Sequence, residues 1–366
     1  MPNPVVVIAE AGGPLARAAK RAGYDPFVID TLGTADAPGA VCESARFPFG
    51  VLDLIAQAPA GASVLLGGPM ENHPDLVDAV TKGRELLGSS TAAMRNSRHP
   101  YALSTLPPFA GLRLCRTKTR LSFAGRLARL AFGSLGKDYL LKPRFESGGR
   151  GIEAWSSNGK IDDAHYLQQL VKGSPMSAAF HADGWSCQFL GMTEMLVGES
   201  AFGAPPFAWC GSIGPVKPSK KAKAALQHLG VVLTQRHDLR GVFGVDLVMD
   251  HRGNLWPIEV NPRFTESMEV IERATGRSAL APTGKAATTT GEPSEMHAKA
   301  AVFAKRAGVV GELPEGCVDA RPTEPPIQPG ERVCGILASG KTVRDCAAGL
   351  QAQLEAVYAA IETASH

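Results

Sequence analysis

Two carboxylates lie close together in residues 241–263, which read G-V-F-G-V-D-L-V-M-D-H-R-G-N-L-W-P-I-E-V-N-P-R. Alternating apolar residues on both sides of the turn-forming residues 250–254 predict a two-stranded hairpin. Folded about that turn, Asp246 falls opposite Glu259, and Asn261 lies on the same face. Like charges directly opposite each other on a sheet are destabilising, so this face predicts a bound cation. Mg²⁺ prefers such oxygen ligands, together with phosphates supplied by a substrate.

The apolar residues of the hairpin select this register, because a slip by one residue would bury both acids. We expect the opposite face to hold Val245, Leu247, Met249, Trp256, Ile258 and Val260. A solvated face with two ordinary surface acids would explain a lone acidic pair. The short spacing to Asn261 and Arg263 favours the cation site, since arginine binds phosphate or carboxylate through two parallel N–H donors.

A glycine loop lies upstream, E-S-G-G-R-G at residues 146–151. The pattern predicts a strand over Tyr139–Lys142 before it and a returning strand over Ile152–Trp155. Glycines let backbone N–H groups approach and bind phosphates, and Lys142 at the end of its strand would reach phosphate oxygens. A glycine hairpin alone is more often a flexible turn. The basic residue beside it and the acidic hairpin downstream favour phosphate binding.

Length and composition limit the class of protein. The chain has 366 residues, of which 44% are hydrophobic and 20% charged, typical of a globular protein with two or three domains. A net charge of +3 argues against general nucleic-acid binding. The apolar run Pro4–Ile8 lacks a basic leader and predicts a strand, not a signal peptide. No stretch approaches the length of a membrane span.

The seven cysteines include no C-x-x-C pair, which suits reduced thiols better than disulfides or a zinc site. We therefore expect a cytoplasmic protein.

The first residues predict a β-α-β unit, with a strand over Val5–Ala9, a helix from Pro14 and a second strand ending at Asp30. Asp30 stands where a dinucleotide-binding fold places its ribose-binding acid, but G-x-G-x-x-G is absent, so NAD binding is disfavoured. Residues 113–144 carry nine Lys or Arg residues and one acid. Amphipathic spacing over Leu121–Phe132 predicts a helix with a solvated basic face, and the local charge would suit an anionic ligand.

Residues 335–342, G-I-L-A-S-G-K-T, match the P-loop pattern G-x-x-x-x-G-K-[ST]. We predict that the match is accidental. Its first half is apolar and strand-like where a phosphate cradle needs a loop. Only 24 residues follow Thr342, too few to supply the later strand that carries a second magnesium-binding acid.

Taken in order, these pieces resemble the ATP-grasp superfamily over about residues 95–280. The matching pieces are the Lys142 strand, the glycine loop, Q-Q-L-V at 168–171, the Asp246 strand and E-V-N-P-R at 259–263. The resemblance implies an ATP-grasp fold of mixed α/β and α+β class, with an N-terminal Rossmann-like pre-ATP-grasp domain and a small C-terminal extension. The expected divisions are an N-terminal α/β domain at 1–95, an ATP-grasp domain at 96–280, a linker at 281–295 and a C-terminal α/β segment completing the grasp region at 296–366.

The resemblance also implies roles for individual residues. Lys142 would contact phosphates beneath a lid formed by Ser147, Gly148, Gly149, Arg150 and Gly151. Adenine would be held by the backbone of Gln169, Leu170 and Val171. Mg²⁺, for which Mn²⁺ can substitute, would be bound by Asp246, Glu259 and Asn261. With Lys142, Arg263 would act on the transferring phosphoryl group or the acyl phosphate.

Two departures from the family pattern concern the nucleotide. Many relatives carry an earlier lysine about forty residues before the second, and here Arg95, Arg98 and Lys118 compete for that role. Many relatives also have glutamate where this chain has Gln169, which puts side-chain contact with adenine in doubt.

ATP-grasp enzymes transfer the γ-phosphoryl group of ATP to a carboxylate, and an amine or similar nucleophile then displaces the phosphate. We therefore expect an ADP-forming carbon–nitrogen ligase that acts on a small-molecule carboxylate and an amine, without nucleic-acid or membrane partners and compatible with a homodimer. Residues 209–215 and 259–272 are similar to a smaller group of predicted ATP-dependent carboligases and, more distantly, to tyramine–glutamate ligases. That similarity implies a role in the synthesis of a methanofuran-like or methanopterin-like cofactor.

Two alternatives remain. One is an ATP-binding regulatory or assembly protein without turnover, suggested by the unassigned first lysine and by Gln169. The other is a biotin-type carboxylase that uses bicarbonate.

Overall fold

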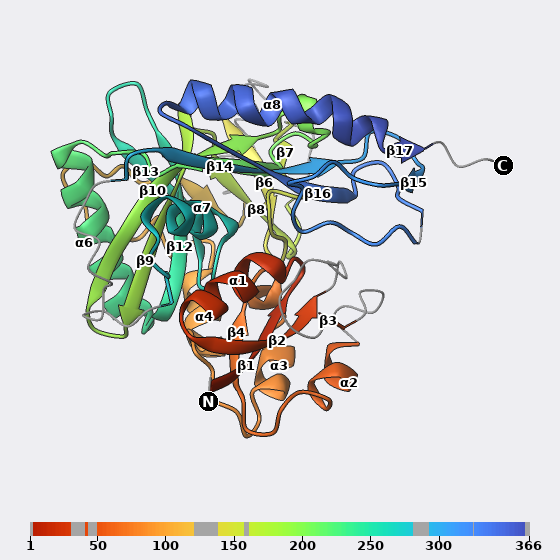
Figure 1. The fold of residues 1–366 in the computed structure, drawn as a ribbon. Coiled ribbons are helices and arrows are strands. Elements are labelled where there is room, and N and C mark those ends of the chain that lie inside the picture. The colour runs from red at the N-terminus through yellow and green to blue at the C-terminus, as the bar shows by residue number, and fades with distance from the viewer. Residues whose placement is uncertain are drawn as a thin grey trace.

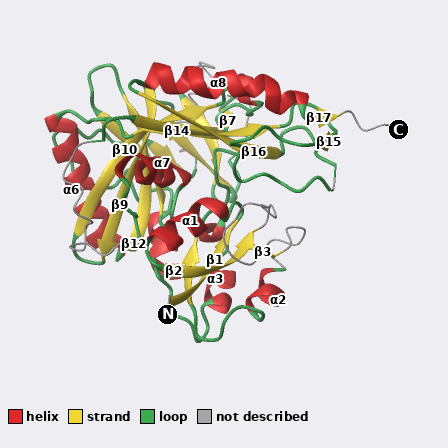
Figure 2. Ribbon diagram, in the orientation of Figure 1, coloured by secondary structure: helices red, strands yellow, loops and turns green. Residues whose placement is uncertain are grey.

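The computed structural model describes residues 3–30, 41–42, 50–120, 138–156, 161–280, 293–324 and 326–362. The predicted helix at 121–132 and most of the predicted linker lie outside these ranges. Within them, an N-terminal unit packs below a larger body built on a long antiparallel sheet (Figures 1 and 2). No helix in the described ranges is both long and apolar enough to cross a membrane.

The N-terminal unit is a parallel sheet of order β3-β2-β1-β4. The predicted β-α-β opening is confirmed. Its elements are β1 (Asn3–Ala9), α1 (Gly13–Arg21), β2 (Tyr24–Asp30), β3 (Val41–Cys42), α2 (Val51–Ile55), β4 (Ser63–Leu66), η1 (Met70–Asn72), α3 (Pro74–Val80) and α4 (Thr91–Ser97). Asp30 is 1% exposed and accepts a 2.7 Å hydrogen bond from the Gly12 N–H, so it supports the turn before α1.

A small antiparallel sheet of order β5-β8-β6-β7 carries the glycine loop between β6 and β7. Its strands are β5 (Thr117–Lys118), β6 (Tyr139–Pro143), β7 (Glu153–Ala154) and β8 (His165–Gln169).

The large sheet has seven strands in the order β13-β12-β9-β10-β11-β14-β16. They are β9 (Ser174–Asp183), β10 (Cys187–Val197), β11 (Trp209–Gly214), β12 (Arg240–Met249), β13 (Leu255–Asn261), β14 (Met296–Phe303) and β16 (Arg332–Gly340). The remaining elements are η2 (Ser200–Phe202), α6 (Lys220–His237), α7 (Glu266–Thr275), β15 (Val309–Val310), α8 (Val343–Ala359) and β17 (Ile361–Glu362). Helix α8 covers β14 and β16, as Figure 1 shows.

The two faces of the large sheet differ in what they pack against. Phe180, Phe243 and Val245 join the core that includes α6. Ala179 and Val242 belong to a second core with α1, β1 and α7. Because side chains alternate between the faces of a strand, Asp246 shares the face of Val242 and lies on the α7 side.

The predicted hairpin forms, and Asp246 pairs with Glu259. The prediction for Trp256 and Ile258 is wrong. A bulge shifts the register so that Leu247 pairs with Pro257, and Trp256 pairs with Val248 instead of joining the buried face. Proline has no N–H for the ladder and is found at edges or bulges, which accounts for the shift. Trp256 is only half-buried, and its Nε1 donates to Asp250 Oδ2 at 3.0 Å.

The P-loop pattern at 335–342 is accidental, as predicted. Residues up to Gly340 belong to β16, which pairs with β14 along its length. Lys341 is exposed, and Thr342 caps α8 in a capping box with Asp345. Six cysteines are free thiols, namely Cys115, Cys187, Cys210, Cys317, Cys334 and Cys346.

Candidate active site

Asp246 and Glu259 form the centre of the site on neighbouring strands. Ser177 Oγ donates to Asp246 Oδ1 at 3.0 Å, and Asn261 Nδ2 donates to Asp246 Oδ2 at 3.0 Å. The predicted ligand set Asp246, Glu259 and Asn261 is therefore brought together. The cause is local, because a tight turn and alternating side chains place all three on one face of the hairpin.

The two carboxylates differ in their affinity for protons. Burial and the facing Glu259 carboxylate raise the pKa of Asp246 to about 6. Burial also raises the pKa of Glu259, but Lys142 and Arg98 outweigh that effect and lower it overall. The unfavourable free energy of holding both acids ionised therefore falls mainly on Asp246, and a bound cation would reduce it.

Two cations from different elements contact Glu259. Lys142, at 4% exposure in β6, places Nζ 3.5 Å from Glu259 Oε2 and 3.3 Å from Gln168 Oε1. Arg98, directly after α4, donates to Glu259 Oε1 at 3.0 Å. A cavity lies between these residues, lined among others by Arg98, Lys142, Arg150, Tyr166, Gln168 and Glu259.

The structure places the three candidates for the earlier cation differently, and the assignment of that role stays a prediction. Of the three candidates for the earlier cation, Arg98 lines the cavity with Lys142. Arg95 instead pairs with Asp75 at the surface, and Lys118 lies over the Tyr139 ring. The spacing of about forty residues was the signal available in the sequence, and it did not separate Arg98 from Arg95, which lies three residues before it.

The glycine loop, residues 146–151, packs against Phe207 and contacts Glu10 of the N-terminal unit. Gly148, Gly149 and Gly151 all have positive φ. A Cβ on Gly149 would lie 2.0 Å from the Phe207 carbonyl oxygen, so a side chain there would displace the loop. Arg150 forms an ion pair with Glu10 of the N-terminal unit. The loop therefore bends back over the cavity toward the N-terminal unit.

Arg263 is held on three sides. It donates to the Glu71 carboxylate at 2.8 Å, to the Phe264 carbonyl oxygen at 3.1 Å and to Asn261 Oδ1 at 3.4 Å. The structure thus places Arg263 beside the acid pair, as predicted. Glu71 was not identified from the sequence, because nothing near it in the chain marks it as a site residue.

The predicted adenine-binding residues lie at the end of β8, outside the residues that line the cavity. The N–H of Gln169 bonds to the Arg116 carbonyl oxygen at 2.8 Å, and the N–H of Leu170 bonds to the Asp138 carbonyl oxygen at 2.8 Å. Those two donors are engaged within the sheet. The role of Gln169, Leu170 and Val171 stays a prediction.

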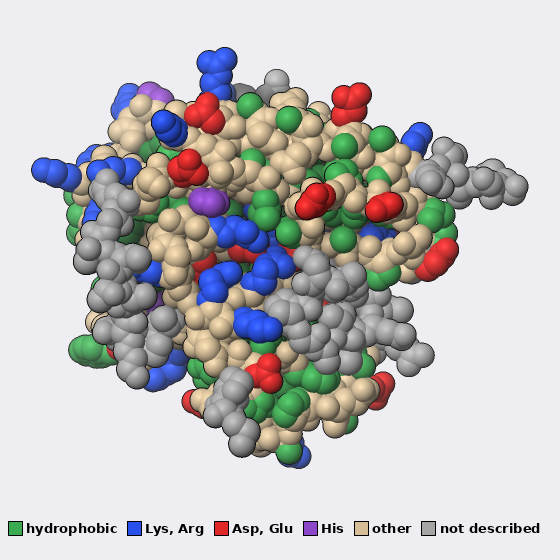
Figure 3. Space-filling model, viewed as in Figure 1, with side chains coloured by type: hydrophobic (Ala, Val, Ile, Leu, Met, Phe, Trp, Pro, Cys, Tyr) green, Lys and Arg blue, Asp and Glu red, His purple; other side chains and the backbone are tan. Residues whose placement is uncertain are grey.

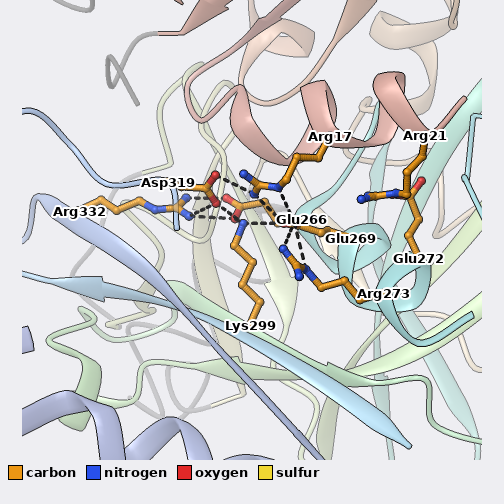
Figure 4. A network of polar contacts seen from close by, with 9 residues as sticks. All are labelled: Arg17, Arg21, Glu266, Glu269, Glu272, Arg273, Lys299, Asp319 and Arg332. Atoms are coloured by element: carbon orange, nitrogen blue, oxygen red, sulfur yellow. Dashed lines mark hydrogen bonds and ion pairs between the residues drawn. The ribbon is translucent and has the colours of Figure 1, made fainter. Parts of the chain in front are cut away.

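A buried ionic network joins α1 of the N-terminal unit to α7 and to β14 of the large sheet (Figure 4). Lys299 of β14, with no exposed side-chain surface, contacts Glu266 at 3.1 Å, Glu269 at 2.8 Å and Asp319. Arg17 of α1 reaches both Glu269 and Asp319 at 2.8 Å. In the view of Figure 3, which is that of Figure 1, Lys and Arg side chains gather at the middle of the molecular surface. In Figure 1, α1 and α7 lie next to each other in this region.

The raised pKa of Asp246 has a measurable consequence. The folded chain binds this proton more tightly than the unfolded chain, so ionisation lowers stability as pH rises from about 4 to about 6. Asp246→Asn cannot ionise. We compare its unfolding free energy with that of wild type at the two pH values. We expect the difference in favour of Asp246→Asn to be about 1–3 kcal/mol larger at pH 7.5 than at pH 4. Urea unfolding of both proteins in metal-free buffer at the two pH values measures this gain, and an equal difference at both would contradict it.

Residues 122–267 match the model of the ATP-grasp domain family. No curated protein sequence matches the chain.

Many solved structures share the fold, and three of them illustrate the range of their activities. Biotin carboxylase from Campylobacter jejuni has a TM-score of 0.69 and 13% identity, covering 96% of this chain and 91% of that one. Phosphoribosylamine–glycine ligase from Thermotoga maritima has a TM-score of 0.68 and 16% identity, covering 96% of each chain. The biotin carboxylase domain of Hydrogenobacter thermophilus 2-oxoglutarate carboxylase, solved with MgADP and bicarbonate, has a TM-score of 0.66 and 15% identity, covering 92% of this chain and 86% of that one. This chain therefore carries an ATP-grasp domain and has the ATP-grasp fold.

Proposed function

We propose that this chain is an ADP-forming ligase that joins a carboxylate to an amine, using ATP and Mg²⁺. The observation that carries the proposal is the facing pair Asp246 and Glu259, with Lys142, Arg98 and Arg263 gathered around it. Phosphoryl transfer depends mainly on positioning and on neutralising charge. Two acids for a metal and three cations for phosphate oxygens are the groups that this chemistry requires.

The donor set fits magnesium. Asp246, Glu259 and the amide oxygen of Asn261 would hold the ion, which would neutralise charge on the phosphates. In the structure Asn261 turns its Nδ2 toward Asp246, so coordination through its oxygen requires a half-turn of the amide. Among the described residues no three His, Cys, Asp or Glu side chains gather as a metal site. The remaining ligands would therefore come from phosphate and water, as is usual for Mg²⁺.

In the proposed reaction, a carboxylate oxygen attacks the γ-phosphorus of ATP, and ADP leaves. Lys142 and Arg98 donate to phosphate oxygens, and Arg263 stabilises charge on the transferring group. The neutral amine then attacks the acyl carbon of the acyl phosphate. Phosphate leaves with the bonding electrons, and the nitrogen loses a proton to give the amide.

ADP release tests the proposal. The purified chain is incubated with ATP, Mg²⁺ and pools of amino acids, amines and pterin-like or furan-like acids. We expect ADP to form only when a carboxylate and an amine are both present. Nucleotide binding without ADP release in every pool would instead support a regulatory or assembly protein.

A second candidate is a biotin-type carboxylase, favoured by the similarity to two biotin carboxylase structures. Its signature would be ATP hydrolysis that depends on bicarbonate and not on an amine. A finer proposal is that the ligase acts in the synthesis of a methanofuran-like or methanopterin-like cofactor. It is supported by the sequence similarity of residues 209–215 and 259–272, and the pterin-like and furan-like pools address it directly.

A further inference from the structure

Glu71 is a buried carboxylate of the N-terminal unit that reaches the candidate active site. It lies in η1, just after β4, and is only 5% exposed. It precedes the segment matched to the ATP-grasp domain, residues 122–267. A carboxylate buried beside a place that binds phosphate would repel the ligand, so its presence calls for an explanation.

The contacts of Glu71 join separate parts of the site. Its Oε1 accepts hydrogen bonds from Ser147 Oγ in the glycine loop at 2.9 Å and from Arg263 Nη2 at 2.8 Å. Arg98 Nη1 lies 3.9 Å from the same oxygen. The neighbouring Asn72 adds a 3.0 Å bond to Ser147 Oγ. One side chain of the N-terminal unit thus links the loop, the arginine after β13 and the arginine after α4.

Glu71 carries a negative charge at neutral pH. Burial raises its pKa, but the guanidinium groups of Arg263 and Arg98 outweigh burial and lower the pKa to about 2. Hydrogen bonds to a charged acceptor are roughly twice as strong as neutral ones. Because the Phe264 carbonyl oxygen also holds Arg263, the plane of its guanidinium is fixed.

We propose that Glu71 is a positioning residue that holds Ser147 of the lid and Arg263 in one arrangement, making the N-terminal unit part of the phosphoryl-transfer site. The kinetic part of this inference rests on the proposed ligase function. Errors of about 1 Å in positioning can cost about a hundredfold in rate, which gives such a residue a large effect without any contact with substrate.

Hydrogen exchange of the full chain without nucleotide tests the anchoring directly. In Glu71→Gln, we expect amide exchange to speed up about tenfold or more in both 144–151 and 259–265, because both lose their charged anchor. Ser147→Ala keeps the pair between Glu71 and Arg263 and should accelerate only 144–151. If Glu71→Gln does not fold, Ser147→Ala still decides the matter. Unchanged exchange of the loop in Ser147→Ala would overturn the inference.

The kinetic test separates positioning from stability. For Glu71→Gln we expect kcat to fall about tenfold to a hundredfold, with a smaller change in KM for ATP. Glu272→Gln is the matched control. Like Glu71, Glu272 is a buried carboxylate in an ion pair between the N-terminal unit and the rest of the chain, and its partner is Arg21 of α1 (Figure 4). This variant removes a buried ion pair between the N-terminal unit and α7 and should leave kcat unchanged.

Each outcome decides a different point. A wild-type kcat in folded Glu71→Gln overturns the positioning role. If the wild-type chain releases no ADP with any substrate pool, the proposed function fails, while the exchange result still decides whether Glu71 anchors the loop and Arg263.

Discussion

Glu259→Gln is expected to lower the rate of ADP formation by on the order of 10³-fold while leaving the fold intact. Gln can still accept the hydrogen bond from Arg98 that now ends on Glu259 Oε1. It cannot supply the negative charge that balances Lys142 and binds a divalent ion. Fold stability should change little, because losing one acid of a facing pair also removes repulsion with Asp246.

Asn261→Ala should have the same consequence through loss of a metal ligand. Steady-state ADP release with the active substrate pool, titrated with Mg²⁺, measures both variants, and thermal unfolding checks that they are folded. Asp250→Asn is the control in the same hairpin. Asp250 organises the turn through bonds to Arg252, Asn254 and Trp256, so its loss should weaken the hairpin without changing kcat. Wild-type turnover in Glu259→Gln or Asn261→Ala would refute the assignment of the site.

Lys299→Met is expected to cost about 3–5 kcal/mol of unfolding free energy. Lys299 is fully buried, and its ammonium contacts three carboxylates, of which Glu269 and Asp319 have no exposed side-chain surface. Methionine fills a similar volume but removes the ammonium group that the three carboxylates share. Arg17, Arg273 and Arg332 remain to balance the charge, which keeps the loss within this range.

Urea unfolding followed by tryptophan fluorescence measures the effect. Arg95→Met is the matched control, because it breaks an ion pair with Asp75 that is exposed on both sides. Exposed pairs contribute about 0–1 kcal/mol, so its unfolding midpoint should barely move. Equal losses in the two variants would show that the network in Figure 4 contributes no more than a surface pair.

The site was predictable where its geometry is local. Asp246 and Glu259 are separated by one turn, and alternation of side chains places them opposite each other whatever the rest of the chain does. The same locality made the glycine loop and Lys142 recognisable. Even here one detail was predicted wrongly, because Pro257 lies at a bulge that moved Trp256 off the predicted face.

The amino-acid sequence by itself determined the fold class, the acid pair, its amide and arginine neighbours and the rejection of the P-loop match. Only the tertiary structure showed that Arg98, and not Arg95 or Lys118, lines the cavity with Lys142. It also brought Glu71 to Arg263 and gathered the carboxylates around Lys299. The physical reason is distance along the chain. Glu71 and Arg263 are 192 residues apart, and their contact depends on how two separately formed sheets pack together, which no local pattern of residue types records.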